Sequence, residues 1–141
     1  MSTETKVPHG SKAWFDMVGT IMVEAATMAK LPPEFNVSLV ERYTDGVEIS
    51  PGFLQGLRFE INGGRPTFRA GAKPGEQGDI TVEVLAADSH ALNTLRSEDP
   101  RFLETYARLQ SSARFTIDGD LSQLGSWFKL VHDRIVDRSA G

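Results

Sequence analysis

The chain of 141 residues has the length of a single domain, and its 24% charged and 40% hydrophobic residues are typical of a globular protein. Its net charge of −4 provides no positive field for a phosphate backbone, which argues against a nucleic-acid partner. The sequence contains no cysteine, which excludes disulfides, zinc–thiolate sites, iron–sulfur clusters and thiol catalysis. This composition fits a reducing compartment, so we expect a cytoplasmic protein.

The chain changes character after its first ten residues. Residues 1–10 are polar and lack periodicity, which predicts a flexible tail, with the folded domain occupying residues 11–141. Apolar side chains then recur at helical spacing from Trp14 to Ala29, and Pro32 ends this predicted helix because proline cannot donate the next hydrogen bond. Polar and charged residues interrupt the apolar run, so we expect no stable membrane insertion.

Strand alternation dominates the middle of the chain. A hairpin turn is predicted at Asn62-Gly63-Gly64, because these residues accept a positive φ. The predicted strands around it are 36–44, 56–62, 67–70 and 79–85.

A loop predicted at residues 45–56 carries two large apolar side chains, Phe53 and Leu54. In an exposed connection, such residues fold inward as a lid over a binding site, expose an interaction patch, or plug the edge of the core. The sequence leaves these alternatives open.

Two short helices are predicted beyond the strands. Asp88 is expected to cap the first, which carries Leu92 and Leu95, and Asp99-Pro100 is expected to begin the second. One face of the predicted sheet is apolar and the other polar, which favours mostly antiparallel pairing with the helices on the apolar side. The sequence therefore predicts an α+β single domain.

Residues 113–136 change from strand alternation to helical spacing across Asp118-Gly119-Asp120. Phe115 and Ile117 share one strand face, and Asp120 is expected to cap a helix over residues 120–136. The apolar stripe of that helix is Leu121, Leu124, Phe128, Val131 and Ile135.

Three segments together resemble the sterol carrier protein type two family. They are the hairpin GLRFEINGGRPTFRAG, the strand GDITVEVLAAD and the corner RFTIDGDLSQLGSWFKL, which occur in the order found in that family. The resemblance implies a mainly antiparallel or mixed sheet of about five strands, covered on one face by helices that enclose an apolar tunnel. It also implies a non-catalytic carrier, without a cofactor, of a sterol, a fatty acid or a fatty acyl-CoA.

The sequence departs from the family pattern in two places. The family often has a glycine before its final strand, where this chain has serine at positions 111 and 112, and the connection between the two short helices is longer than usual. The chain ends in Ser-Ala-Gly rather than in the peroxisomal address of some eukaryotic relatives, which favours a bacterial-type member.

The predicted ligand-lining residues are those on the apolar faces that must meet between sheet and helices. No catalytic residue and no metal ligand is predicted, because His90 and His132 lack a second histidine at helical spacing and no Gly-x-Ser-x-Gly elbow occurs. The lining set is Met17, Ile21, Phe59, Val82, Phe115, Leu124, Phe128 and Val131, with Phe53 and Leu54 as the possible lid.

Two other functions stay open. The first is a small cofactor-free isomerase or cyclase that acts on a hydrophobic substrate with one buried acid or histidine, and a polar group deep in an apolar pocket would favour it. The second is an accessory module whose cavity is filled by its own side chains and whose surface near Phe53 binds another protein.

Overall fold

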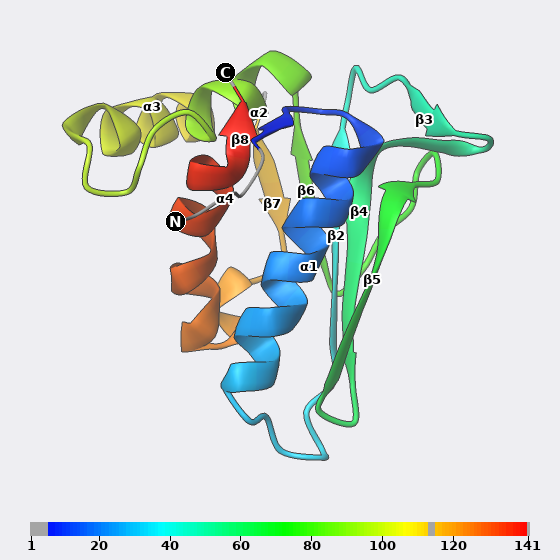
Figure 1. Cartoon of the computed structure of the whole chain (residues 1–141). Coiled ribbons are helices and arrows are strands. Elements are labelled where there is room, and N and C mark those ends of the chain that lie inside the picture. The colour runs from blue at the N-terminus through cyan, green and yellow to red at the C-terminus, as the bar shows by residue number, and fades with distance from the viewer. Residues whose placement is uncertain (1–5, 113–114, 141) are drawn as a thin grey trace.

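A computed structural model describes residues 6–112 and 115–140 of the chain (Figure 1). The helices are α1 (Lys12–Met28), α2 (Ala86–Leu92), α3 (Pro100–Ser111) and α4 (Val131–Arg138), with two 3-10 helices, η1 (Leu121–Leu124) and η2 (Ser126–Leu130). The strands are β1 (Val7–Pro8), β2 (Val37–Tyr43), β3 (Glu48–Ser50), β4 (Phe53–Asn62), β5 (Arg65–Ala72), β6 (Ile80–Val84), β7 (Thr116–Asp118) and β8 (Ser139–Ala140).

The main sheet is mixed and has six strands in the described part of the chain. Strand β2 lies at its centre, antiparallel to β4 and parallel to β6, while β5 pairs with β4 and β7 pairs with β6. The helices lie on one side of this sheet, with α1 packed across β4 and β5 and beside α4 (Figure 1). The predicted α+β fold with a mixed sheet is confirmed.

Helix α1 forms where the apolar stripe predicted it. The Ser11 side chain caps its first turn by accepting a hydrogen bond from the Trp14 amide at 3.1 Å. Gly19 allows the helix to approach β5 closely, because a Cβ atom at this position would lie 2.1 Å from the Phe68 ring. The core between helix and sheet includes Trp14, Phe15, Met22, Leu39, Phe59, Ile80 and Leu124.

The N-terminal residues that the structure describes lie within the fold rather than in a tail. Val7 and Pro8 pair in parallel with Ser139 and Ala140, and the His9 ring lies between aromatic neighbours. The predicted tail is therefore wrong for residues 7–10, because a two-residue pairing with a distant strand leaves no periodic signal in the sequence. Residues 1–5 of that predicted tail lie outside the described residues.

The predicted loop at residues 45–56 is largely strand. Strand β3 pairs with the start of β4, and Phe53 and Leu54 are the first residues of β4. Strand β4 thus begins earlier than predicted. A β-bulge between Leu54 and Leu57 shifts the register there, so the apolar and polar residues do not alternate regularly across this part of the strand.

The predicted helix over residues 120–136 is broken. Gly125 has a φ of 108°, a left-handed conformation that ends η1 and separates it from η2, and the α-helix begins only at Val131. Asp120 does act as a cap, since its side chain accepts from the Ser122 amide at 2.9 Å, but the element it caps is η1. The apolar spacing survives because 3-10 and α-helical turns are of similar length in residues.

The first short helix also begins earlier than predicted. Its N-cap is Leu85, so Asp88 lies in the first turn of α2 instead of capping it, and Leu95 lies beyond its end. The second begins as predicted, because Asp99 accepts a hydrogen bond from the Arg101 amide at 2.9 Å and Pro100 starts α3.

Candidate functional site

A cavity of about 300 Å³ lies between the inner face of the sheet and the helical layer, and we name it the apolar pocket. Strands β2, β4 and β6 form one wall, and residues of α1, α3, η2 and α4 form the other. Predicted residues that line it are Val82, Phe115, Phe128 and Val131. Lining residues that the sequence analysis did not single out include Val18, Met22, Leu39, Leu57, Tyr106 and Ile135.

One acidic side chain interrupts this apolar lining. Among the residues that the structure describes, Glu41 is the only carboxylate that borders the pocket. Burial raises the pKa of Glu41 to about 7, with no hydrogen bond or neighbouring charge that counteracts it. By accessible area the side chain is half-buried, and it lines the pocket.

Sequence reasoning missed Glu41, although a signal was present. In the register of the sheet, Glu41 lies opposite Leu57 on β4 and Val82 on β6, so all three point to the inner face. Alternation along β2 places Leu39, Glu41 and Tyr43 on that same face. A charged residue at an inward position of an amphipathic strand marks a functional candidate.

A hydrogen-bonded group of polar side chains, which we name the His9 cluster, adjoins the pocket at Ser89. Its members are His9, Tyr43, Ser89 and Asn93. The Tyr43 hydroxyl lies 2.8 Å from Ser89 Oγ and 2.9 Å from His9 Nε2, and Asn93 Nδ2 donates to the Ser89 carbonyl at 2.8 Å. Burial, together with the nearby His90, lowers the pKa of His9 to about 4.

The His9 cluster holds the N-terminal segment against the fold. His9 Nε2 lies 3.3 Å from Ser89 Oγ, an arrangement reminiscent of a nucleophile and its base. A histidine with so low a pKa is a weak base at neutral pH, and the Tyr43 hydroxyl already bonds both groups. The geometry therefore supports a structural role for the cluster.

His132 lines the pocket from α4. Its Nε2 atom donates to the Leu95 carbonyl at 2.8 Å, since a carbonyl oxygen only accepts, and its ring packs against Phe102 with centroids 4.6 Å apart. These contacts fix the ring at the pocket wall and use its Nε2 proton to anchor the segment between α2 and α3. His90 lies in the last turn of α2.

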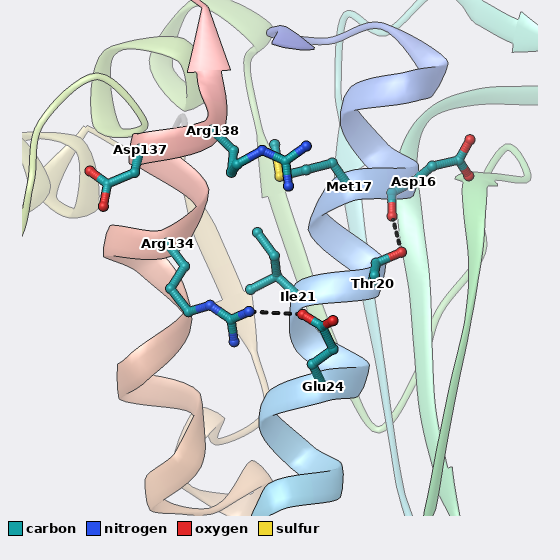
Figure 2. A pocket seen from close by; sticks show the side chains of 8 residues that line it. All are labelled: Asp16, Met17, Thr20, Ile21, Glu24, Arg134, Asp137 and Arg138. Carbon is teal, nitrogen blue, oxygen red and sulfur yellow. Dashed lines mark hydrogen bonds and ion pairs between the residues drawn. The ribbon is translucent and has the colours of Figure 1, made fainter. Parts of the chain in front are cut away.

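A second hollow, the charged groove, runs between α1 and α4 and has a volume of about 370 Å³ (Figure 2). Glu24 on α1 and Arg134 on α4 bridge it with an ion pair of 2.8 Å, and the Thr20 hydroxyl donates to the Asp16 carbonyl. The predicted lining residues Met17 and Ile21 lie here, on the groove side of α1.

The other predicted residues lie outside both hollows. Phe59 and Leu124 are fully buried in the core and border neither hollow of the described chain. Phe53 packs under the Arg69 guanidinium, 4.9 Å from its ring centroid, and Leu54 borders a separate surface depression with Arg42 and Lys73. The structure thus places neither Phe53 nor Leu54 over the apolar pocket.

Within residues 6–112 and 115–140, no three His, Asp or Glu side chains gather closely enough to hold a metal ion. In the same ranges, no helix combines the length and hydropathy needed to cross a membrane.

No protein-family model and no curated protein sequence matches the chain. In structure, the chain is similar to a crystal structure of sterol carrier protein 2, with a TM-score of 0.52 and 14% identity over 91% of this chain and 96% of that one. It is also similar to the ubiquinone synthesis protein UbiJ-SCP2, with a TM-score of 0.47 and 15% identity over 92% of this chain and 93% of that one.

A further similarity covers 82% of this chain, with a TM-score of 0.47 and 21% identity, in a double mutant of the sec-alkyl sulfatase PisA1. The chain spans only 16% of the length of that sulfatase. The match to sterol carrier protein 2, which covers nearly all of both chains, identifies the architecture. This chain has the α+β fold of sterol carrier protein 2.

Proposed function

We propose that the chain binds one apolar, lipid-like molecule in the apolar pocket and releases it unchanged. The observation that carries this proposal is the apolar pocket of about 300 Å³ between sheet and helices. Cavities of this size and lining are typical of small-molecule sites. A ligand that enters it leaves water at a gain of roughly 25 cal/mol per Å² of apolar surface.

The volume favours a medium-length chain. A methylene group fills about the same space as a water molecule in the liquid, roughly 30 Å³, so the pocket holds about ten such groups. This is less than the bulk of a sterol and close to a straight chain of about ten carbons. We assign Val82, Phe115, Phe128 and Val131 as the residues that contact it.

Displacement of a fluorescent fatty-acyl probe by straight-chain alcohols from octanol to hexadecanol tests this function. We expect affinity to rise with chain length and then level off near decanol, because longer chains leave carbons outside the pocket. A parent protein that binds neither the probe nor any of the alcohols would refute the carrier function. Mass spectrometry of small molecules that co-purify with the protein supplies an independent identification.

Glu41 supports a second candidate, a cofactor-free isomerase for an apolar substrate. A carboxyl group whose pKa is about 7 can accept a proton from a substrate carbon and return it at another position near neutral pH. The test is NMR detection of solvent deuterium entering an unsaturated ketone of matched length. Exchange that the parent catalyses and Glu41→Gln does not would favour the isomerase, and no exchange above the buffer rate would exclude it.

A further inference from the structure

The glutamate side chains on the two faces of the sheet differ in whether they form ion pairs. On the outer face, Glu83 pairs with Arg42 at 3.0 Å, and Glu60 and Glu76 both pair with Arg58, at 2.5 and 3.2 Å. Glu76 also bonds Arg69. On the inner face, Glu41 has neither an ion pair nor a hydrogen bond among the described residues.

An unpartnered carboxyl in this position adds nothing to the fold. Its neighbours across the sheet are the apolar side chains of Leu57 and Val82, and a carboxylate buried among such groups costs free energy unless it is paired. An apolar residue at position 41 would fill the same wall at no such cost. Glu41 lines the pocket, so a molecule inside the pocket is a partner that its carboxyl can reach.

We propose that Glu41 is the polar anchor of the apolar pocket and selects an apolar ligand that carries a hydrogen-bond donor, a hydroxyl or an ammonium group, over one that carries an anion. This rests on the proposed binding function and adds the chemical class of the ligand. A donor pairs with the carboxyl and removes the cost of burying it unpaired. An anionic head group at the same place meets a like charge.

Other titratable groups border the pocket and set the pH range of the test. They are Tyr106 on α3, Lys129 on η2 and His132 on α4, and Tyr43 neighbours Glu41 on β2. Lys129 is exposed, and His132 is bonded to the Leu95 carbonyl. Because burial raises the pKa of Glu41 to about 7, an ammonium ligand gains affinity as pH rises through that value. A hydroxyl ligand stays nearly independent of pH, since it can donate to the carboxylate or accept from the acid.

The experiment compares ligands of equal length by probe displacement, each below its critical micelle concentration. Decylamine and decanoate differ in head-group charge, and decanol and decyl methyl ether differ in the presence of a donor. At pH 8 we expect the parent to bind decylamine at least about tenfold more tightly than decanoate, and decanol several-fold more tightly than the ether. Glu41→Gln removes most of the amine preference, and Glu41→Leu removes the preference for decanol over the ether.

Glu83→Gln is the matched control, because Glu83 lies on the outer face of the adjacent strand and is paired with Arg42. It should leave every ratio unchanged, and thermal melting establishes that each variant is folded. Equal affinities for all four ligands, or preferences that persist in both Glu41 variants, would overturn the anchor while leaving the binding function intact. A parent that binds none of the four would instead refute the proposed function, and the anchor with it.

Discussion

The two hollows beside α1 are alike in size and opposite in chemistry. The apolar pocket, of about 300 Å³, is lined by Val18 and Met22 of α1. The charged groove, of about 370 Å³, is lined by Met17 and Ile21 of the same helix. In the groove, Glu24 and Arg134 neutralise each other at the surface. In the pocket, Glu41 has no such partner among the residues that the structure describes. The two hollows therefore differ less in volume than in whether these acidic side chains are paired.

Helix geometry explains how neighbouring residues come to serve different hollows. Successive residues of an α-helix are rotated by about 100° around its axis, so a broad apolar stripe has two flanks. One flank of α1 faces the sheet and the pocket. The other faces α4 and the groove (Figure 2). Apolar residues on the second flank seal the contact between the two helices.

The largest difference between the hollows should appear when a charge is added to each. Phe128→Asp places a carboxylate in the apolar pocket and should weaken binding of the fluorescent probe at least about 100-fold, because the ligand would have to desolvate it. Thr20→Asp adds the same group to the rim of the charged groove and should leave affinity unchanged. Phe128→Leu keeps the pocket apolar and should stay within about tenfold of the parent.

The same variants would show whether the ligand site has been assigned to the wrong hollow. A folded Phe128→Asp protein that binds the probe like the parent would show that Phe128 does not contact the ligand. Loss of binding in Thr20→Asp would place the ligand in the groove instead.

The second difference concerns stability and pH. Between the ordinary pKa of 4.5 and the folded-state pKa of about 7, the folded state keeps a proton on Glu41 that the unfolded state has lost, so the free energy of unfolding falls as pH rises through this range. A pKa moved from 4.5 to about 7 is equivalent to about 3 kcal/mol in full. Relative to the parent, Glu41→Gln should therefore gain about 2 kcal/mol of stability between pH 5 and 8.

Urea unfolding at each pH measures this gain as a difference, which cancels the opposite contribution of His9, whose lowered pKa costs stability as pH falls. Parallel profiles for Glu41→Gln and the parent would mean that Glu41 is not buried in the folded protein.

The third difference concerns the segment between η1 and η2, which positions Phe128 against the pocket. Gly125→Ala should cost about 1–2 kcal/mol, because Gly125 has a φ of 108° and the added Cβ would lie 3.0 Å from the Trp127 ring. It should also weaken probe binding by shifting the pocket wall. Gly75→Ala is the control, since Gly75 also has a positive φ, of 73°, while the new Cβ meets no atom within 4 Å. Equal probe affinity in the two variants would show that the conformation of the segment between η1 and η2 does not affect ligand binding in the pocket.

The smallest effect should come from the ion pair of the groove. Glu24 and Arg134 are about half exposed, and exposed pairs contribute about 0.5 kcal/mol. Arg134→Gln should therefore change the free energy of unfolding by no more than this and leave ligand affinity as it was. A loss of binding would give the groove a role in ligand entry.

Sequence periodicity predicted the helices and strands that are defined by contacts between residues close together in the sequence. Helix α1, the hairpin of β4 and β5, and β6 follow from alternation and helical spacing, and Asp99-Pro100 marks the start of α3. The pairing of Val7 and Pro8 with the C-terminal residues depends on contacts far apart in the sequence, which no local pattern records. Gly125 could have been recognised as an interruption, but its spacing also fits a continuous helix.

The candidate site was predictable only in part. Inward-facing positions such as Phe59 and Val82 follow from alternation, yet only Val82 borders the pocket, because the side chains packed opposite decide where space is left. Glu41 was recognisable as a charge at an inward position. That Glu41 has no partner among the described residues could not be recognised from the sequence, because this depends on which side chains of α1, α3 and α4 lie on the opposite wall of the pocket.

Methyl NMR of the labelled protein titrated with decanol tests the central claim, that the apolar pocket is the ligand site. We expect saturable shifts at Val18, Val82 and Ile135, which line the pocket, and much smaller ones at Ile21 in the groove and at Val40, which is fully buried. Largest shifts at Ile21, or no saturable shift at any of these methyl groups, would contradict it.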